Sequence, residues 1–367
     1  MSKSTSLTRI ALQKFKKNFW GVFSFSFLVI AILTALFSYA IAPDNSKNAN
    51  QMHLSIHSKS PGFKVQMLTI PSPVEKQNKI SVFFLGKSNA NTEIPIAEYQ
   101  VTNQSILITE YTTDGSKGLQ KEYPLSVFPN VKKIEEVPIQ YISEKQFILG
   151  TDKYGRDLLS RMLIGIRISL AIGFVAVFIS LVIGITLGAI AGFYGGKIDA
   201  IIMWVINVTW SIPTLLLVIA ITLALGKGFW QVFIAVGLTM WVEVARVVRG
   251  QVMSVKEMQF VTAARALGYT NSRIIIRHIL PNAMAPVIII SAANFAGAIL
   301  IESGLSFLGI GAQPPMPSWG GIIKDHYAYI ILGKPYLAII PGLAIMSLVT
   351  AFMLMGNALR DALDVRN

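Results

Sequence analysis

The stretch FVTAARALGYTNSRIIIRHILPN, Phe260–Asn282, separates two long apolar runs of the chain. It begins with small residues, becomes polar and then basic, and ends at a proline. Thr262–Leu267 predicts a short helix, because Ala, Arg and Leu are strong helix formers. Gly268 follows, and glycine readily adopts the left-handed conformation that ends a helix. We therefore expect a short helix in a loop, followed by a second helix that starts near Pro281.

The predicted loop helix has a compact apolar face. Ala263, Ala264 and Leu267 stand three and four residues apart, so they share one side, and Arg265 projects elsewhere. Small residues allow another protein's backbone to approach closely. Spacing alone leaves two interpretations open: a docking helix for a partner protein, or an amphipathic helix lying on a membrane surface.

The composition indicates an integral membrane protein. Of the 367 residues, 53% are hydrophobic and 14% are charged, whereas a soluble domain carries about 25% charged residues. Several runs extend over more than about 18 residues without a charge, which is the length of a membrane span. The sequence contains no cysteine, which excludes disulfides and thiolate metal sites.

Six membrane spans are predicted from these apolar runs. They cover Trp20–Ala42, Ile168–Phe193, Ala200–Leu225, Phe229–Ala245, Ala283–Ile301 and Tyr336–Gly356. The first ends in an Ala-x-Ala pattern, but its apolar core is longer than the about 7–15 residues of a signal peptide, so we expect an uncleaved anchor. Pro213, Pro286 and Pro341 lie within spans, where neighbouring helices can satisfy the freed carbonyl groups.

The formal net charge of +13 is distributed as expected for a cytoplasmic N-terminus. Lys and Arg gather before the first span, between Arg246 and Arg277, and after the last span. Lys153, Arg156, Arg161 and Arg167 fall on the other side, but long translocated segments are largely exempt from the positive-inside rule. We expect both termini in the cytoplasm and contact with anionic lipid, and no binding of nucleic acid.

Residues 43–150 form a polar insert between the first two spans. KISVFFLG, SILITEY and VPIQYIS are rich in β-branched and aromatic residues, and turn-forming clusters such as TTDGSKG separate them. This alternation predicts a small β-rich extracytoplasmic domain. His53 and His57 stand four apart, but two histidines do not fill a coordination shell, so no metal site is expected.

The opening stretch resembles the cytoplasmic coupling loop of permease subunits of ATP-binding-cassette (ABC) importers, E-A-A-x-x-x-G, nine residues, and I/H-x-L-P. Thr262-Ala263-Ala264, Gly268 and His278-Ile279-Leu280-Pro281 carry this pattern, with Thr262 in place of the glutamate. Other stretches look like the second permease type of the dipeptide/oligopeptide/nickel branch: LGTDKYGRDLLSRMLIGIRISL, AGFYGGKIDAIIMW, SIPTLLL, ESGLSFLGIGAQPPMPSWG and GNALRDALD. The resemblance covers roughly residues 1–42 and 145–367 and leaves out most of the insert.

The resemblance implies an all-α polytopic membrane protein with the MetI-like type I ABC importer permease fold. Six transmembrane helices are implied, with the β-rich insert between the first and second. The chain would then comprise 1–42, the insert 43–150 and the permease core 151–367, with a coupling loop at about 246–281. The residues implied in ATPase coupling are Thr262, Ala263, Ala264, Arg265, Leu267, Gly268, His278, Leu280 and Pro281.

The same resemblance implies a set of partners in the bacterial plasma (inner) membrane. A second homologous permease would complete the translocation path, two ATPase subunits would hold the coupling helices, and an extracytoplasmic solute-binding protein would deliver cargo. The cargo would be a peptide or a related small solute such as nickel. The sequence contains no G-x-x-x-x-G-K-[ST] phosphate loop, so we expect no cofactor in this chain and ATP with Mg²⁺ on the ATPase subunits.

Several charged residues at span ends are further candidates. Glu302 ends the fifth span and is a gate or interface candidate, because an ionisable residue at membrane depth is functional by default. The alternative is that Glu302 lies near enough to the surface to be solvated. Arg156 and Asp157 are expected to cap the second span or contact the partner permease. Glu243 is expected to form a structural ion pair with one of two nearby arginines, Arg246 or Arg249.

Three other classes of protein fit the sequence less well. An ion-coupled secondary transporter would show internal repeats and charged, interrupted helices at the midplane. A membrane-embedded enzyme would need a catalytic motif, and neither H-E-x-x-H nor G-x-S-x-G occurs. A sensor would need a cytoplasmic output domain, and little of the chain follows the last span. We therefore expect a permease subunit and not an enzyme.

Overall fold

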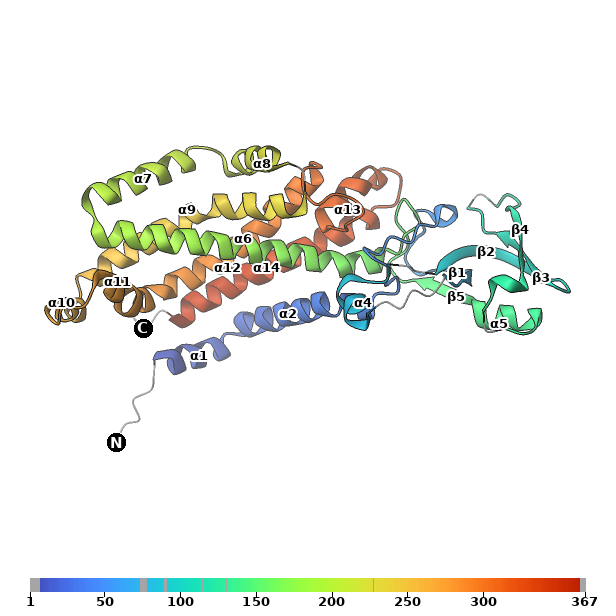
Figure 1. Cartoon of the computed structure of the whole chain (residues 1–367), viewed down its shortest axis with the longest axis horizontal. Coiled ribbons are helices and arrows are strands. Elements are labelled where there is room, and N and C mark those ends of the chain that lie inside the picture. The colour runs from blue at the N-terminus through green and yellow to red at the C-terminus, as the bar shows by residue number, and fades with distance from the viewer. Residues whose placement is uncertain are drawn as a thin grey trace, which may run out of the picture. The chain divides into compact units, whose positions relative to one another are not determined.

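The computed structural model describes residues 7–72, 78–88, 91–113, 115–129, 131–226 and 228–363. The chain divides into two compact units (Figure 1). The helical unit comprises residues 1–32, 169–313 and 343–367, and the sheet unit comprises 33–168 and 314–342. Three of the four boundaries fall inside long helices, α2 (Phe19–Leu36), α6 (Leu158–Tyr194) and α14 (Tyr336–Leu363), and the fourth, between residues 313 and 314, falls in a loop.

The helical unit is built from long apolar helices joined by short ones. Besides parts of the three helices above, it contains α1 (Leu7–Lys17), α7 (Gly196–Trp210), α8 (Thr214–Leu225), α9 (Phe229–Lys256), α10 (Gln259–Ala266), α11 (Asn271–Ile274), a π-helical turn Ile275–Ile279 and α12 (Leu280–Phe307). Many large side chains on these helices are exposed, among them Phe23, Trp204 and Trp230. An apolar exterior of this kind suits lipid as the surrounding solvent.

The number of spans differs from the sequence prediction. Among the described residues, five helices are long and apolar enough to cross a membrane, and a sixth span results if α7 and α8 count as one. The predicted span Ala200–Leu225 is broken, because α7 and α8 meet at a bend of 92°, and it counts as a span only if the two helices are taken together. The chain breaks at Ser211–Pro213: proline has no N–H to donate, and it disfavours helical geometry in the residue before it.

Glycines on α6 allow a close approach of α9. Gly184, Gly188 and Gly192 recur every fourth residue, so they line one face of α6. A Cβ atom on Gly188 would lie 2.5 Å from the carbonyl oxygen of Ala245 on α9. The two backbones are therefore nearly in contact, which is how small residues hold membrane helices together.

The sheet unit contains a five-stranded antiparallel sheet in the order β4-β3-β2-β1-β5. Its strands are β1 (Phe63–Ile70), β2 (Thr92–Val101), β3 (Ser105–Glu110), β4 (Gln120–Pro124) and β5 (Ile142–Phe147). One core cluster of this unit contains side chains from the strands and from the segment between β4 and β5: Leu68, Ile96, Ile106, Ile108, Phe128, Ile134 and Val137. The β-branched and aromatic composition thus predicts part of this sheet correctly, at β3.

Two of the three predicted strand segments are helical instead. KISVFFLG forms α4 (Lys79–Leu85), which begins where the Asn78 side chain accepts a hydrogen bond from the backbone N–H of Ile80 and ends at Gly86 with φ 78°. VPIQYIS opens with α5 (Val137–Tyr141), which carries proline in its first turn, before β5 starts. Helix-capping and first-turn signals outweighed the β-branched composition in both places. SILITEY forms β3 as predicted.

Candidate functional site

The loop helix predicted at Thr262–Leu267 is α10. It ends as the sequence indicates, because Gly268 has φ 76°. The backbone N–H of Gly268 donates to the Arg265 carbonyl at 2.9 Å, and that of Tyr269 donates to the Ala264 carbonyl at 3.2 Å. This pair of bonds is the Schellman motif, which satisfies carbonyls that a helix end would otherwise leave open. The helix therefore has a sharply defined end.

The residues of the apolar face predicted for this helix are not all exposed in the structure. Ala264 is buried with Val261 in a core cluster that also contains Val252, Val255 and Ile274. Ala263 is exposed and Leu267 is 72% exposed. The prediction that Ala263, Ala264 and Leu267 form one docking face is thus wrong for Ala264, because α10 uses that side chain to pack on its own protein. The exposed apolar surface consists of Ala263 and Leu267, beside Thr262.

The segment after the loop helix runs directly into a long membrane helix. Asn271–Phe307 forms one apolar rod of 37 residues, in which the π-helical turn joins α11 to α12. The His278 ring stacks on Tyr269 with a centroid distance of 5.7 Å, and the Arg273 guanidinium lies 4.1 Å from the Tyr269 ring centroid. His278 therefore holds the loop between α10 and α12. Leu280 and Pro281 open α12, and Pro281 is exposed.

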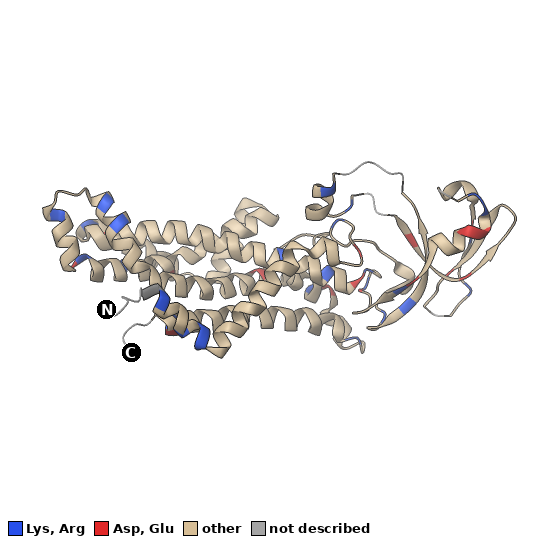
Figure 2. Cartoon of the chain, turned by 90° about the horizontal axis from the view of Figure 1, so that it is seen from below, with Lys and Arg blue, Asp and Glu red and all other residues tan. Residues whose placement is uncertain are grey.

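Basic side chains surround the exposed part of this loop. Arg265, Arg273 and Arg277 are exposed, and Figure 2 shows Lys and Arg gathered at the end of the helical unit that holds α10 and α11. Arg265 also lies 5.5 Å from the ring centroid of Phe193. The arrangement gives a short helix with a defined C-terminal end and a small apolar patch inside a positive surface.

Glu302 lies in α12 and is 0% exposed. The Ser306 hydroxyl donates to its Oε1 at 2.6 Å, and the same hydroxyl accepts a hydrogen bond from the backbone N–H of Ala312 at 3.2 Å. Glu302 thereby fixes the turn that follows α12. The alternative of a solvated side chain near the surface is wrong, because the carboxylate is buried.

Arg156 and Asp157 lie in the sheet unit. Asp157 precedes α6 and accepts a hydrogen bond from the backbone N–H of Ser160 at 2.8 Å, which caps that helix. Burial raises the pKa of Asp157. Arg156 donates from Nε to Asp152 Oδ2 at 2.6 Å, and Arg161 approaches the same oxygen at 3.6 Å. Arg156, Arg161 and Asp152 form a buried ionic cluster. It contains two of the four basic residues that precede the second span.

Glu243 does not form the predicted ion pair with either arginine. Arg249 donates to Asp199 on α7 at 2.6 Å. Arg246 donates to Asn207 Oδ1 at 3.2 Å and stacks 3.5 Å from the ring centroid of Trp210. Sequence spacing could not show this, because both partners come from α7, which is distant in the chain. Among the described residues, Glu243 has no ion-pair partner within 4.0 Å.

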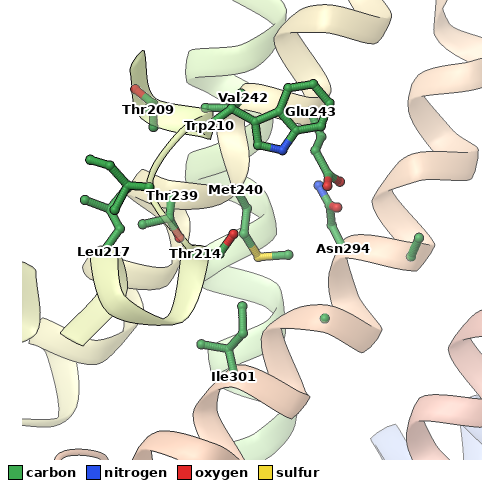
Figure 3. A pocket seen from close by; sticks show the side chains of 13 residues that line it. Thr209, Trp210, Thr214, Leu217, Thr239, Met240, Val242, Glu243, Asn294 and Ile301 are labelled. Atoms are coloured by element: carbon green, nitrogen blue, oxygen red, sulfur yellow. The ribbon is translucent and has the colours of Figure 1, made fainter. Parts of the chain in front are cut away.

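A pocket of about 320 Å³ lies where the broken helix pair meets two long helices. Its walls come from the end of α7, the start of α8, the middle of α9 and α12. Figure 3 shows the Glu243 carboxylate and the Asn294 amide pointing toward each other at its edge. This site was missed from the sequence, because Asn294 looks like an isolated polar residue and Glu243 was assigned to an arginine.

Comparison with known proteins places these features in a family. Residues 184–366 match the family described as "Binding-protein-dependent transport system inner membrane component". The dipeptide transport system permease protein DppC of Alkalihalophilus pseudofirmus is 43% identical over 59% of this chain and 70% of that protein. The glutathione transport system permease protein GsiD of Pectobacterium atrosepticum is 41% identical, over 59% and 71%.

Two further proteins are similar to this chain. The oligopeptide transport system permease protein OppC of Haemophilus influenzae is 41% identical over 61% of this chain and 72% of that protein. A solved structure of the inward-facing methionine ABC transporter MetNI aligns with 55% of this chain and 95% of its own, with a TM-score of 0.46 and 19% identity. The extent and identity of the sequence matches lead to one conclusion: the chain belongs to the family of binding-protein-dependent transport system inner membrane components, the permease subunits of ABC importers.

Proposed function

We propose that this chain forms half of the translocation path of a peptide importer and couples to a separate ATPase through residues 260–281. The observation that carries the coupling role is α10: a capped helix that presents Ala263 and Leu267 to solvent inside a basic surface. Residues 267–270 form a short turn between α10 and a helical rod that begins at Asn271. A push on α10 would therefore reach α12 through this turn and through α11.

The proposed cargo is a short peptide. The similar permeases carry the names of dipeptide, oligopeptide and glutathione transport systems, and all of these solutes contain amide bonds and a free amino group. A second permease would complete the path, two ATPase subunits would receive the α10 helices with bound ATP and Mg²⁺, and a solute-binding protein would deliver the peptide. The proposed orientation has both termini and α10 in the cytoplasm, which agrees with the basic loop surface.

The coupling role is tested by copurification with two matched variants. Leu267→Asp places a charge on the exposed apolar patch of α10, and Leu119→Asp makes the same change at a site with similar exposure, 72% against 70%. The chain is purified from its native membrane in mild detergent, and its partners are identified by mass spectrometry. We expect the wild-type chain and Leu119→Asp to retain the ATPase. The amount of ATPase that copurifies with Leu267→Asp should be at least about tenfold lower, since burying an unpaired charge is costly.

Two results would contradict the proposal at different points. Absence of any ATPase from the wild-type preparation in every mild detergent would remove the energy source and with it the importer function. Equal recovery of the ATPase with Leu267→Asp and wild type would leave the importer intact but exclude α10 as the docking element.

A further inference from the structure

The pocket beside the helix break has an unusual backbone wall. Trp210, Ile212 and Thr214 line it from the bend between α7 and α8. Within an apolar layer, interrupted helix backbone is tolerated where it faces protein or a water-filled cavity, because its freed N–H and C=O groups need partners. Trp210, Ile212 and Thr214 are exposed, so the break is open to a ligand or to a partner subunit.

Two side chains supply the polar chemistry of this pocket. Glu243 lies near the middle of α9 and has no ion-pair partner within 4.0 Å among the described residues. Asn294 is 3% exposed, and its Nδ2 has no hydrogen-bond partner in the described part of the chain. A buried amide donor without an acceptor is costly, so the site is built for a ligand that brings an acceptor.

Two threonines that line the pocket are bound within their own helices. The Thr239 and Thr209 hydroxyls donate to carbonyls of their own helices, at 2.8 and 2.9 Å. Both arginines near Glu243 are bound elsewhere, to Asp199 and Asn207. Met240, Leu217 and Ile301 add an apolar wall. The Glu243 carboxylate and the Asn294 amide lie side by side at this pocket (Figure 3).

We propose that this pocket binds the amino-terminal end of the transported peptide. The Glu243 carboxylate receives the peptide ammonium group, and Asn294 Nδ2 donates to the first peptide carbonyl oxygen. The two groups are adjacent in every peptide, as the carboxylate and amide are adjacent here. The volume of about 320 Å³ is at the lower end of small-molecule sites, about 300–1,000 Å³, so it holds the first one or two residues. This inference rests on the proposed function and adds the part of the cargo that is recognised.

The test measures peptide binding and transport separately. The complete transporter, with partner permease and ATPases, is embedded in nanodiscs without its binding protein. Saturation-transfer NMR then reports contacts of millimolar trialanine and of N-acetyl-trialanine. We expect wild type to bind trialanine with the strongest saturation at its first methyl group and to bind the N-acetyl form at least about tenfold more weakly. Glu243→Gln and Asn294→Leu should each weaken trialanine binding about tenfold.

A control variant and a transport assay complete the experiment. Glu135→Gln removes an exposed carboxylate in the sheet unit and should bind trialanine as wild type does. ATP-driven uptake of trialanine into proteoliposomes, with binding protein present, should fall in the two pocket variants and stay unchanged in the control. The amount of copurified partner permease is measured for every variant.

The outcomes separate this inference from the proposed function. If wild type imports no peptide, the proposed function fails. If wild type imports peptide but shows no trialanine contact, or binds both forms equally, the amino-terminal subsite is excluded. Loss of the partner permease from Glu243→Gln and Asn294→Leu would also overturn it, because the pocket would then be a contact between subunits.

Discussion

His326 is a buried residue whose protonation is set by its neighbours in the sheet unit. Its Nδ1 lies 2.7 Å from the Ile322 carbonyl, and its Nε2 accepts a hydrogen bond from the backbone N–H of Lys153 at 3.1 Å. One ring nitrogen thus donates and the other accepts, which requires the neutral ring. Burial lowers the pKa of His326 below its usual value of 6.5.

The lowered pKa predicts an acid-sensitive fold. The unfolded chain takes up this proton at a higher pH than the folded chain, so the stabilisation is complete above the unfolded pKa of about 6.5. It is lost as pH falls from there toward the lowered folded pKa. We expect the melting temperature of wild type to drop between pH 7 and pH 5, and that of His326→Gln to drop less.

Two other histidines define the controls for this pH dependence. Burial also lowers the pKa of His53, so His326→Gln should keep part of the slope. His57 is exposed, and His57→Gln should retain the full wild-type slope. Identical slopes for wild type and His326→Gln in a thermal-unfolding series would show that His326 does not contribute.

At the scale of elements, the close contact between α6 and α9 depends on glycine residues, which have no side chain. Gly188 leaves no room for a Cβ atom, since that atom would lie 2.5 Å from the Ala245 carbonyl. Gly250 on α9 has no atom within 4 Å of its Cβ position. Alanine favours helix over glycine by about 1 kcal/mol at either site, so the two substitutions differ in packing alone.

Gly188→Ala and Gly250→Ala should therefore act in opposite directions. Gly188→Ala forces the helices apart, and overpacking of this kind costs about 1–3 kcal/mol. Gly250→Ala should be neutral or mildly stabilising. Thermal unfolding of the detergent-purified chain measures both effects. A Gly188→Ala variant as stable as wild type would mean that α6 and α9 can separate without loss.

The sequence predicts correctly those features of the helices and strands that depend on neighbouring residues in the chain. The helix end at Gly268 follows from residue chemistry that acts within a few positions. The sequence predicts the start of the next helix near Pro281, whereas the continuous helix begins at Asn271. The sequence indicates a break near Pro213, but no local signal gives the 92° angle between α7 and α8. The burial of Ala264 and the pairing of Arg249 with Asp199 depend on contacts between distant segments. Such contacts leave no periodic pattern in the sequence, and the pocket at Glu243 and Asn294 was missed for the same reason.

For the whole molecule, the proposed orientation can be measured directly because the sequence has no cysteine. Leu119 before β4 and Asn271 at the start of α11 are both exposed. Leu119→Cys should react with a membrane-impermeant maleimide added to intact spheroplasts. Asn271→Cys should react after the membrane is permeabilised. The reverse pattern would invert the proposed orientation, and labelling of both from outside would contradict a single membrane-inserted topology.

The unbroken helix from Asn271 to Phe307 has a mechanical consequence. At about 1.5 Å per residue, its 37 residues span about 55 Å. A rod of that length acts as a lever, since a tilt of about ten degrees moves one end by roughly 10 Å relative to the other. Asn294 and Glu302 lie along this same rod. If the loop is displaced as proposed, the proposed peptide pocket at Asn294 and the turn held by Glu302 would move together.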